Sequence, residues 1–134
     1  MSELSSGKIL LLDDDTFLVG IYKEKFMEKK YAVQAVFTVD EALRIIRGGF
    51  VPDAIIFDLE MKGKDGFVFL QTLREQKLAQ GAYLIALTNH SGVEDRAKAI
   101  DLGTNRYIVK AEMIPEEVVF ATENAIAKLK EAQK

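Results

Sequence analysis

Short apolar runs recur along the chain and alternate with longer stretches of helical periodicity. Most of these runs are continuously apolar, which is typical of strands buried on both faces of a parallel sheet. The pattern predicts five strands, at residues 9–12, 31–36, 54–57, 83–87 and 107–109. Each is followed by a helix, so the chain consists of five β-α units with tight connections.

The helices between the strands have recognisable starts. The sequences TVDE, beginning at Thr38, and SGVE, beginning at Ser91, both match the capping box, in which a hydroxyl and a glutamate satisfy free backbone N–H groups. Pro115 suits the first turn of the last helix, where its missing donor costs nothing. Gly103 is predicted to end the helix that begins near residue 93.

Parallel strands joined by helices imply right-handed crossovers and an α/β, doubly wound parallel sheet. In such sheets, ligands lie beyond the carboxyl ends of the strands. The residues that follow the predicted strands are polar: Asp13 and Asp14 after the first, Asp58 after the third, Thr88 after the fourth and Lys110 after the fifth. The topology therefore predicts that three carboxylates, one hydroxyl and one ammonium meet at one edge.

Carboxylates without cysteine or histidine partners favour a hard cation such as Mg²⁺, which takes one or two carboxylates plus water and phosphate oxygens. A lysine and a threonine are suitable donors around a phosphoryl group, and an aspartate is a competent phosphoryl acceptor. Taken singly, each residue has a plainer interpretation: DDD is most often a helix cap or turn, and Lys110 a surface charge. Their joint placement at successive strand ends favours the functional interpretation.

Composition excludes several classes of function. The chain has 134 residues, a net charge of −3, no cysteine and one histidine. There is no basic field for nucleic acid or an anionic membrane, no thiolate metal site and no disulfide. The apolar runs are too short to cross a bilayer, and residues 1–8 lack a signal-peptide core. We expect a cytoplasmic single domain with a flexible leader at 1–7.

Three motifs carry a family resemblance: KILLLDDD, PDAIIFDLEMKGKDGF and IALTNHSGVEDRAKAIDLGTNRYIVKAEM. In this order and spacing, over about residues 8–130, the chain resembles the receiver domain of two-component response regulators, in the stand-alone, chemotaxis-type form. The resemblance implies a flavodoxin-like, three-layer α/β/α fold with strand order 2-1-3-4-5. It also implies a receiver domain at 8–134 with no output domain.

The resemblance assigns a role to each residue of the predicted edge. Asp58 corresponds to the phosphoacceptor, and Lys110 to the lysine that pairs with it and then with the phosphoryl oxygens. Asp13, Asp14 and Asp58 correspond to the Mg²⁺ ligands, Asp13 through water, and the backbone carbonyl of Glu60 supplies another ligand.

A second group of residues corresponds to the switch and to its tuning. Thr88 matches the switch hydroxyl, and Tyr107 matches the aromatic residue whose inward or outward rotamer reports the state. Glu60 and His90, two residues after Asp58 and Thr88, occupy positions that tune phosphoryl lifetime in the family, and Asn89 lies beside them.

The implied mechanism is in-line attack by Asp58 on the phosphohistidine of a sensor kinase or phosphotransfer protein. The protein is then a signalling switch that catalyses its own phosphorylation and dephosphorylation, not a conventional enzyme. It signals by protein contact through the fourth helix, fifth strand and fifth helix, for which Arg106, Tyr107 and residues 94–102 are candidates. The kinase, the target and the oligomeric state stay open.

Three positions depart from the family pattern. Asn89 stands where a small residue usually follows the threonine, and either narrows the phosphoryl pocket or turns to solvent. Ala111 replaces the proline that usually follows the lysine, so a trans peptide with a rearranged loop is expected, because cis costs about 2.5–4 kcal/mol before a non-proline residue. Lys62 replaces a frequent proline and is expected to be a solvated surface lysine.

Two other functions are compatible with parts of the sequence. A pseudo-receiver would keep the fold and signal without phosphorylation; Asn89 and Ala111 allow this alternative. A phosphatase of the haloacid dehalogenase type also places acidic residues after its first strand, and Asp13 and Asp15 fit that spacing loosely. The later Gly-Asp motif and the cap domain of that class are missing, and flavin binding is disfavoured by the acidic first loop.

Overall fold

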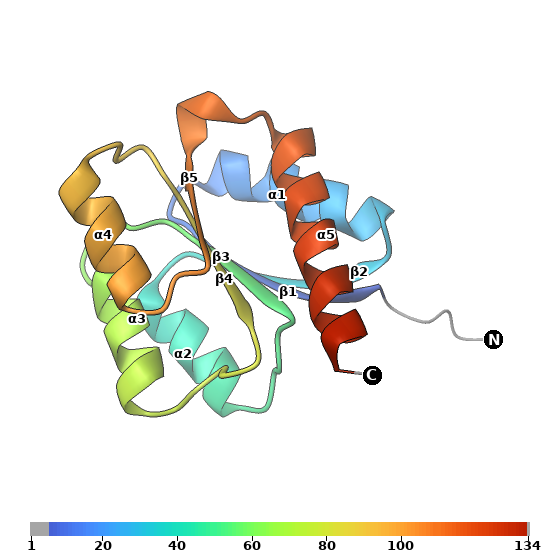
Figure 1. Ribbon diagram of the computed structural model, residues 1–134, viewed down its shortest axis with the longest axis horizontal. Coiled ribbons are helices and arrows are strands. Elements are labelled where there is room, and N and C mark those ends of the chain that lie inside the picture. The colour runs from blue at the N-terminus through green and yellow to red at the C-terminus, as the bar shows by residue number, and fades with distance from the viewer. Residues whose placement is uncertain (1–5, 134) are drawn as a thin grey trace.

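The computed structural model describes residues 6–133 and contains a central sheet flanked by helices (Figure 1). The strands are β1 (Gly7–Leu12), β2 (Tyr31–Val36), β3 (Ala54–Phe57), β4 (Tyr83–Thr88) and β5 (Arg106–Val109). The helices are α1 (Thr16–Glu28), α2 (Val39–Arg47), α3 (Gly66–Glu75), α4 (Val93–Asp101) and α5 (Pro115–Ala132), with a short 3₁₀ turn, η1 (Lys110–Glu112). The five predicted strands are all confirmed, with ends that differ by no more than two residues.

The strands form one parallel sheet in the order β2-β1-β3-β4-β5. In the registers, Ile9 lies opposite both Val33 on β2 and Ala54 on β3. The order confirms the predicted doubly wound sheet of the flavodoxin-like type. Because all strands are parallel, their carboxyl ends lie along one edge, and every polar residue that follows a strand is delivered there.

Two apolar cores cover the two faces of the sheet. On β1, Leu10 and Leu12 join a cluster with buried residues of α2 and α3, whereas Ile9 and Leu11 join a cluster with α1 and α5. Figure 1 shows the same division, with α1 and α5 on one face and α2, α3 and α4 on the other. Both faces of the strands are therefore buried, which explains their continuously apolar sequences.

Helix caps agree with the sequence in most places. Thr38 is the N-cap of α2, and its hydroxyl accepts from the N–H of Glu41 at 3.2 Å. Pro115 is the first residue of α5, and Gly103, with φ +111°, follows the end of α4.

The prediction that Ser91 caps α4 is wrong. The helix begins at Val93, its N-cap is Gly92, and no side-chain hydrogen bond caps it. The preceding loop is held instead by the backbone of His90, whose N–H donates to Thr88 and whose carbonyl accepts from Tyr107. These contacts place Ser91 one residue too early to cap.

The leader prediction is only partly within the described chain. Residues 1–5 lie outside the described residues. Gly7 is the first residue of β1, so the sheet begins one residue before the predicted domain boundary at residue 8.

One glycine is required by a close approach. A Cβ on Gly66, at the start of α3, would lie 2.8 Å from the Cα of Leu59 and even nearer to the carbonyl oxygen of Asp58. The side-chain-free residue lets α3 begin directly against the chain segment that carries Asp58.

Candidate functional site

Lys110 binds two buried carboxylates at the carboxyl edge of the sheet. Its Nζ lies 2.8 Å from Asp13 Oδ2 and 2.8 Å from Asp58 Oδ2. Their side chains are 11% and 6% exposed, and that of Lys110 is 14% exposed, so little water screens these contacts. The residues come from the ends of β1, β3 and β5, as the topology predicted. The positive charge between them allows two like charges to lie so close together.

Backbone N–H groups fix the acidic side chains. Asp13 Oδ1 accepts from the N–H of Asp15 at 3.0 Å, and Asp58 Oδ1 accepts from the N–H of Glu60 at 3.0 Å. Asp14 Oδ2 accepts from the N–H of Lys62 at 3.1 Å. These bonds leave the acidic pair and Asp58 preoriented before any ligand arrives.

The third aspartate of the DDD sequence has a structural role. Asp15 is the N-cap of α1 and accepts from the N–H of Leu18 at 3.1 Å. The run therefore combines both interpretations offered by the sequence: a helix cap, and two carboxylates directed at the sheet edge. Lys62 is exposed, as predicted for a surface lysine, and its backbone N–H donates to Asp14.

Burial and hydrogen bonds shift the pKa values of two groups in this cluster, Asp13 and Lys110. Burial raises the pKa of the Asp13 carboxyl, although the hydrogen bonds from Lys110 and Asp15 act in the opposite direction. Burial alone would lower the pKa of Lys110, but its hydrogen bonds to Asp13 and Asp58 raise it above the ordinary value. Lys110 therefore stays an ammonium at neutral pH.

A cavity of about 180 Å³ opens over these residues, lined by Asp13, Asp14, Asp15, Asp58, Glu60, Asn89 and Lys110. Its donors are carboxylate and amide oxygens, the chemistry that suits a hard cation. Within residues 6–133, no three His, Cys, Asp or Glu side chains converge closely enough to enclose a metal ion. The residues fit Mg²⁺ in the usual way for that ion, with one or two carboxylates and water in the other positions.

The two predicted switch residues lie at the same edge and are buried. Thr88 is fully buried at the end of β4, and its Oγ1 accepts from the N–H of His90 at 3.3 Å. Tyr107 is 8% exposed, and its hydroxyl donates to the carbonyl oxygen of His90 at 2.7 Å. The tyrosine is therefore in the inward arrangement, held by the loop that follows Thr88.

His90 makes contacts that the sequence did not reveal. Its Nδ1 lies 2.7 Å from Asp95 Oδ2, and its Nε2 forms a short contact with Glu60 Oε2. The hydrogen bonds to Asp95 and then to Glu60 raise the pKa of His90 above its ordinary value. Asp95 lies five residues from His90 and Glu60 lies thirty away, so no local pattern marks the cluster.

The structure shows the positions of the two remaining departures from the family pattern, Ala111 and Asn89. The Lys110–Ala111 peptide is trans, as expected, and the chain enters η1 directly after β5. Asn89 is exposed and also lines the cavity over Asp58. Its side chain thus stands at the pocket entrance, which combines the two possibilities that the sequence left open.

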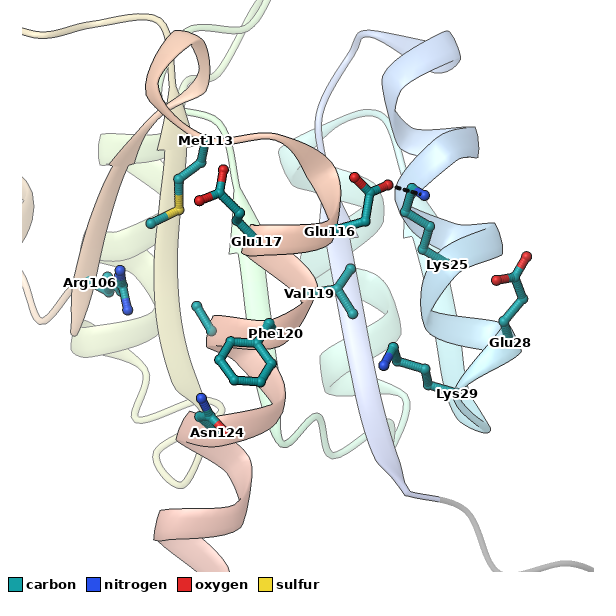
Figure 2. Close-up of a pocket in the computed structure, with 11 residues that line it drawn as sticks. Lys25, Glu28, Lys29, Arg106, Met113, Glu116, Glu117, Val119, Phe120 and Asn124 are labelled. Carbon is teal, nitrogen blue, oxygen red and sulfur yellow. Dashed lines mark ion pairs between the residues drawn. The ribbon is translucent and has the colours of Figure 1, made fainter.

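A second cavity, of about 660 Å³, shares no lining residue with the first and lies against α1, β5 and α5 (Figure 2). Two lysines of its walls are in ion pairs: Lys25 with Glu116, as drawn in Figure 2, and Lys29 with Glu123 at 3.2 Å. Phe120 is 65% exposed in this region. The cavity offers contact surface and no converging set of reactive groups among the described residues that line it.

A parallel sheet of this order, with aspartates and a lysine at its carboxyl edge, defines a flavodoxin-like α/β domain of the CheY type. The model of the response regulator receiver domain matches residues 9–121. The chain belongs to this family, whose members bind Mg²⁺ at the acidic pocket and are generally phosphorylated by histidine kinases.

Individual relatives agree with this assignment. The chain is 30% identical to the transcriptional regulatory protein ResD of Bacillus subtilis over 89% of its own length and 48% of the relative's. It is 30% identical to the nitrate/nitrite response regulator protein NarL of Escherichia coli, over 95% of this chain and 58% of that one. The chain thus spans about half the length of these curated relatives.

Solved structures show the same fold. A CheY-like response regulator receiver domain protein from Methanospirillum hungatei superposes with a TM-score of 0.85 at 22% identity, covering 97% of this chain and 99% of that chain.

Between residues 6 and 133, no helix is long and apolar enough to span a bilayer.

Proposed function

We propose that this receiver domain is a phosphorylation-dependent switch in which Asp58 accepts a phosphoryl group from a histidine kinase or phosphotransfer protein. The observation that carries the proposal is Lys110, which binds Asp58 and Asp13 together at the carboxyl edge of the sheet. An Asp58 oxygen attacks phosphorus in line, the P–N bond of the donor phosphohistidine breaks, and the imidazole leaves with the bonding electron pair.

The residues of the site have separate tasks in this step. Asp13 and Asp14, with the backbone carbonyl of Glu60, would hold Mg²⁺, which when bound offsets the negative charge of the phosphoryl oxygens. Lys110 supplies a second positive charge that is already in place. Without the Lys110 ammonium, the Asp58 carboxylate would lie near the Asp13 carboxylate with no positive side chain between them.

The signal is proposed to leave through α4, β5 and α5. Thr88 ends β4, next to Asn89 in the pocket lining, and its Oγ1 is linked through the backbone of His90 to Tyr107. A shift of the threonine would therefore disturb the contact that keeps Tyr107 inward. The arrangement is bistable: a local charge change selects between two packings of one surface.

The proposal is tested by intact mass after incubation with Mg²⁺ and a small acyl phosphate. We expect the parent to gain one phosphoryl group and Asp58→Asn to gain none. Asp101→Asn, which removes an exposed carboxylate at the end of α4, is the matched control and should behave as the parent. No gain in a parent that still binds Mg²⁺ would contradict the proposal and support the pseudo-receiver alternative, with Asn89→Ala as the next variant.

A further inference from the structure

We propose that Asp95 is a positioning residue for the phosphoryl chemistry, acting through His90 to close one side of the Asp58 pocket against water. This role rests on the proposed function, because it concerns the lifetime of the phosphoryl group on Asp58. Asp95 lies on α4 and does not line the pocket itself. Any effect of Asp95 on the pocket therefore passes through His90, which its carboxylate contacts.

The connection is a chain of three side chains from three segments. Asp95 Oδ2 lies 2.7 Å from His90 Nδ1, and His90 Nε2 contacts Glu60 Oε2. Glu60 lies in the loop after β3 and lines the cavity over Asp58. His90 lies in the loop after β4, so the contact of its imidazole with Glu60 joins the two loops beside the pocket.

Asp95 determines which way the imidazole points. A carboxylate that accepts from Nδ1–H fixes the ring orientation and directs Nε2 to the opposite side. Here that side carries Glu60. Without the Asp95 carboxylate, the ring is free to rotate, its contact with Glu60 is lost, and the two loops are no longer joined beside the pocket. A water molecule then has a wider approach to the acyl phosphate.

The backbone of His90 is fixed separately from its ring. Its N–H donates to Thr88 Oγ1 at 3.3 Å, and its carbonyl oxygen accepts from Tyr107 at 2.7 Å. The side chain of Asp95 is partly exposed and has no part in these bonds. Asp95→Asn should therefore fold as the parent does and alter the side-chain bridge alone.

The first test measures phosphoryl lifetime. Parent, Asp95→Asn and Glu94→Gln are phosphorylated with Mg²⁺ and a small acyl phosphate, the donor is removed, and the decay is followed by intact mass. Loss of one charge-assisted hydrogen bond should speed the decay of Asp95→Asn about three- to tenfold. Glu94→Gln removes an equal charge from the neighbouring exposed residue of α4 and should decay as the parent.

Two further readouts distinguish positioning from a general effect on α4. His90→Gln and the double variant His90→Gln/Asp95→Asn should decay at the same rate, since Asp95 has nothing left to position. His90 is the only histidine in the sequence, so nitrogen NMR of its imidazole reports this ring alone in a protein without a histidine tag. The Nδ1–H contact should be present in the parent and in Glu94→Gln and lost in Asp95→Asn.

The outcomes separate this role from the proposed function. Equal or slower decay in Asp95→Asn, or additive effects in the double variant, would overturn the positioning role while leaving Asp58 as acceptor. A parent that takes up no phosphoryl group overturns the proposed function and this role with it. An unchanged imidazole signal in Asp95→Asn would overturn the contact on which the role depends.

Discussion

At the scale of single residues, a few buried polar groups determine what the carboxyl edge is able to do. Lys110 contacts both Asp13 and Asp58, and backbone N–H groups satisfy the other oxygen of each carboxylate. Buried charges are tolerated when they are paired and hydrogen-bonded in this way. The site is therefore already ordered before a ligand binds.

Tyr22 gives a prediction about alkaline pH. It is 5% exposed under the acidic edge, and burial raises the pKa of its phenol to about 12, against about 10 in an unfolded chain. The protonated form is thus favoured by the fold. Its contribution to stability is fully present below about pH 10 and is lost as the pH rises through about 12.

Urea unfolding between about pH 8 and 11 tests this prediction. The free energy of unfolding of the parent should fall more steeply above about pH 10 than that of Tyr22→Phe. Tyr31 and Tyr107, whose pKa values burial also raises, are present in both proteins and cancel in the comparison. Parallel curves for the two proteins would show that the Tyr22 phenol titrates normally.

The sequence predicted where the candidate site residues lie, because topology places them. Asp13, Asp14, Asp58, Thr88 and Lys110 all lie at the ends of strands whose apolar sequences are unambiguous, and parallel pairing brings these ends together without further information. The bridge of Glu60, His90 and Asp95 was not predictable in this way. It depends on side-chain directions in two loops and on α4, and nothing in the local sequence specifies those.

At the scale of elements, the start of each helix shows where local signals suffice. Thr38 caps α2 through residues adjacent in sequence: its hydroxyl accepts from the N–H of Glu41 and donates to the Glu41 carboxylate. Ser91 carries the same kind of signal but does not cap α4, whose N-cap is Gly92, and Thr88 and Tyr107 hold the backbone of His90 just before it. Tertiary contacts of the preceding loop compete here with the local preference.

The close approach of α3 to the chain segment around Asp58 is tested by a substitution at Gly66. Gly66→Ala would press a methyl group against the Asp58 carbonyl and the Leu59 Cα, neither of which is a flexible side chain. We expect a loss of about 1–3 kcal/mol in the free energy of unfolding, measured by urea denaturation. Phosphorylation by a small acyl phosphate should slow as well, because the displaced segment carries Asp58.

Gly20→Ala is the matched control for this substitution. Gly20 lies inside α1, is exposed, and has open space where a Cβ would stand. The same change there should stabilise the protein by about 0.5–1 kcal/mol. If both variants were stabilised, the close approach at Gly66 would be contradicted.

At the scale of the whole molecule, two cores share a single sheet. Strand β1 contributes alternate residues to both clusters, as Leu10 and Leu11 show. The cores therefore should not unfold independently, and a chain of this length is expected to unfold in one cooperative step. Ligand binding at the acidic edge is then measurable through the stability of the entire domain.

Thermal unfolding with increasing Mg²⁺ uses this coupling. An ion that binds only the folded state stabilises it by about 2.7 kcal/mol at a concentration about one hundred times its Kd. We expect the melting temperature of the parent to rise with Mg²⁺ and that of Asp14→Asn to stay nearly constant. Asp101→Asn should respond as the parent, and an equal response of all three proteins would place the ion elsewhere.

The turns at the opposite edge of the sheet are suitable places for attaching a label. Because all strands are parallel, the connections α1–β2, α2–β3, α3–β4 and α4–β5 turn at the edge remote from Asp58. Gly81, in the α3–β4 connection, is exposed there, and the space that a Cβ would enter is open. A fluorescent label attached at Gly81 would therefore leave the acidic edge unobstructed, so labelled protein is suitable for the Mg²⁺ and phosphorylation measurements.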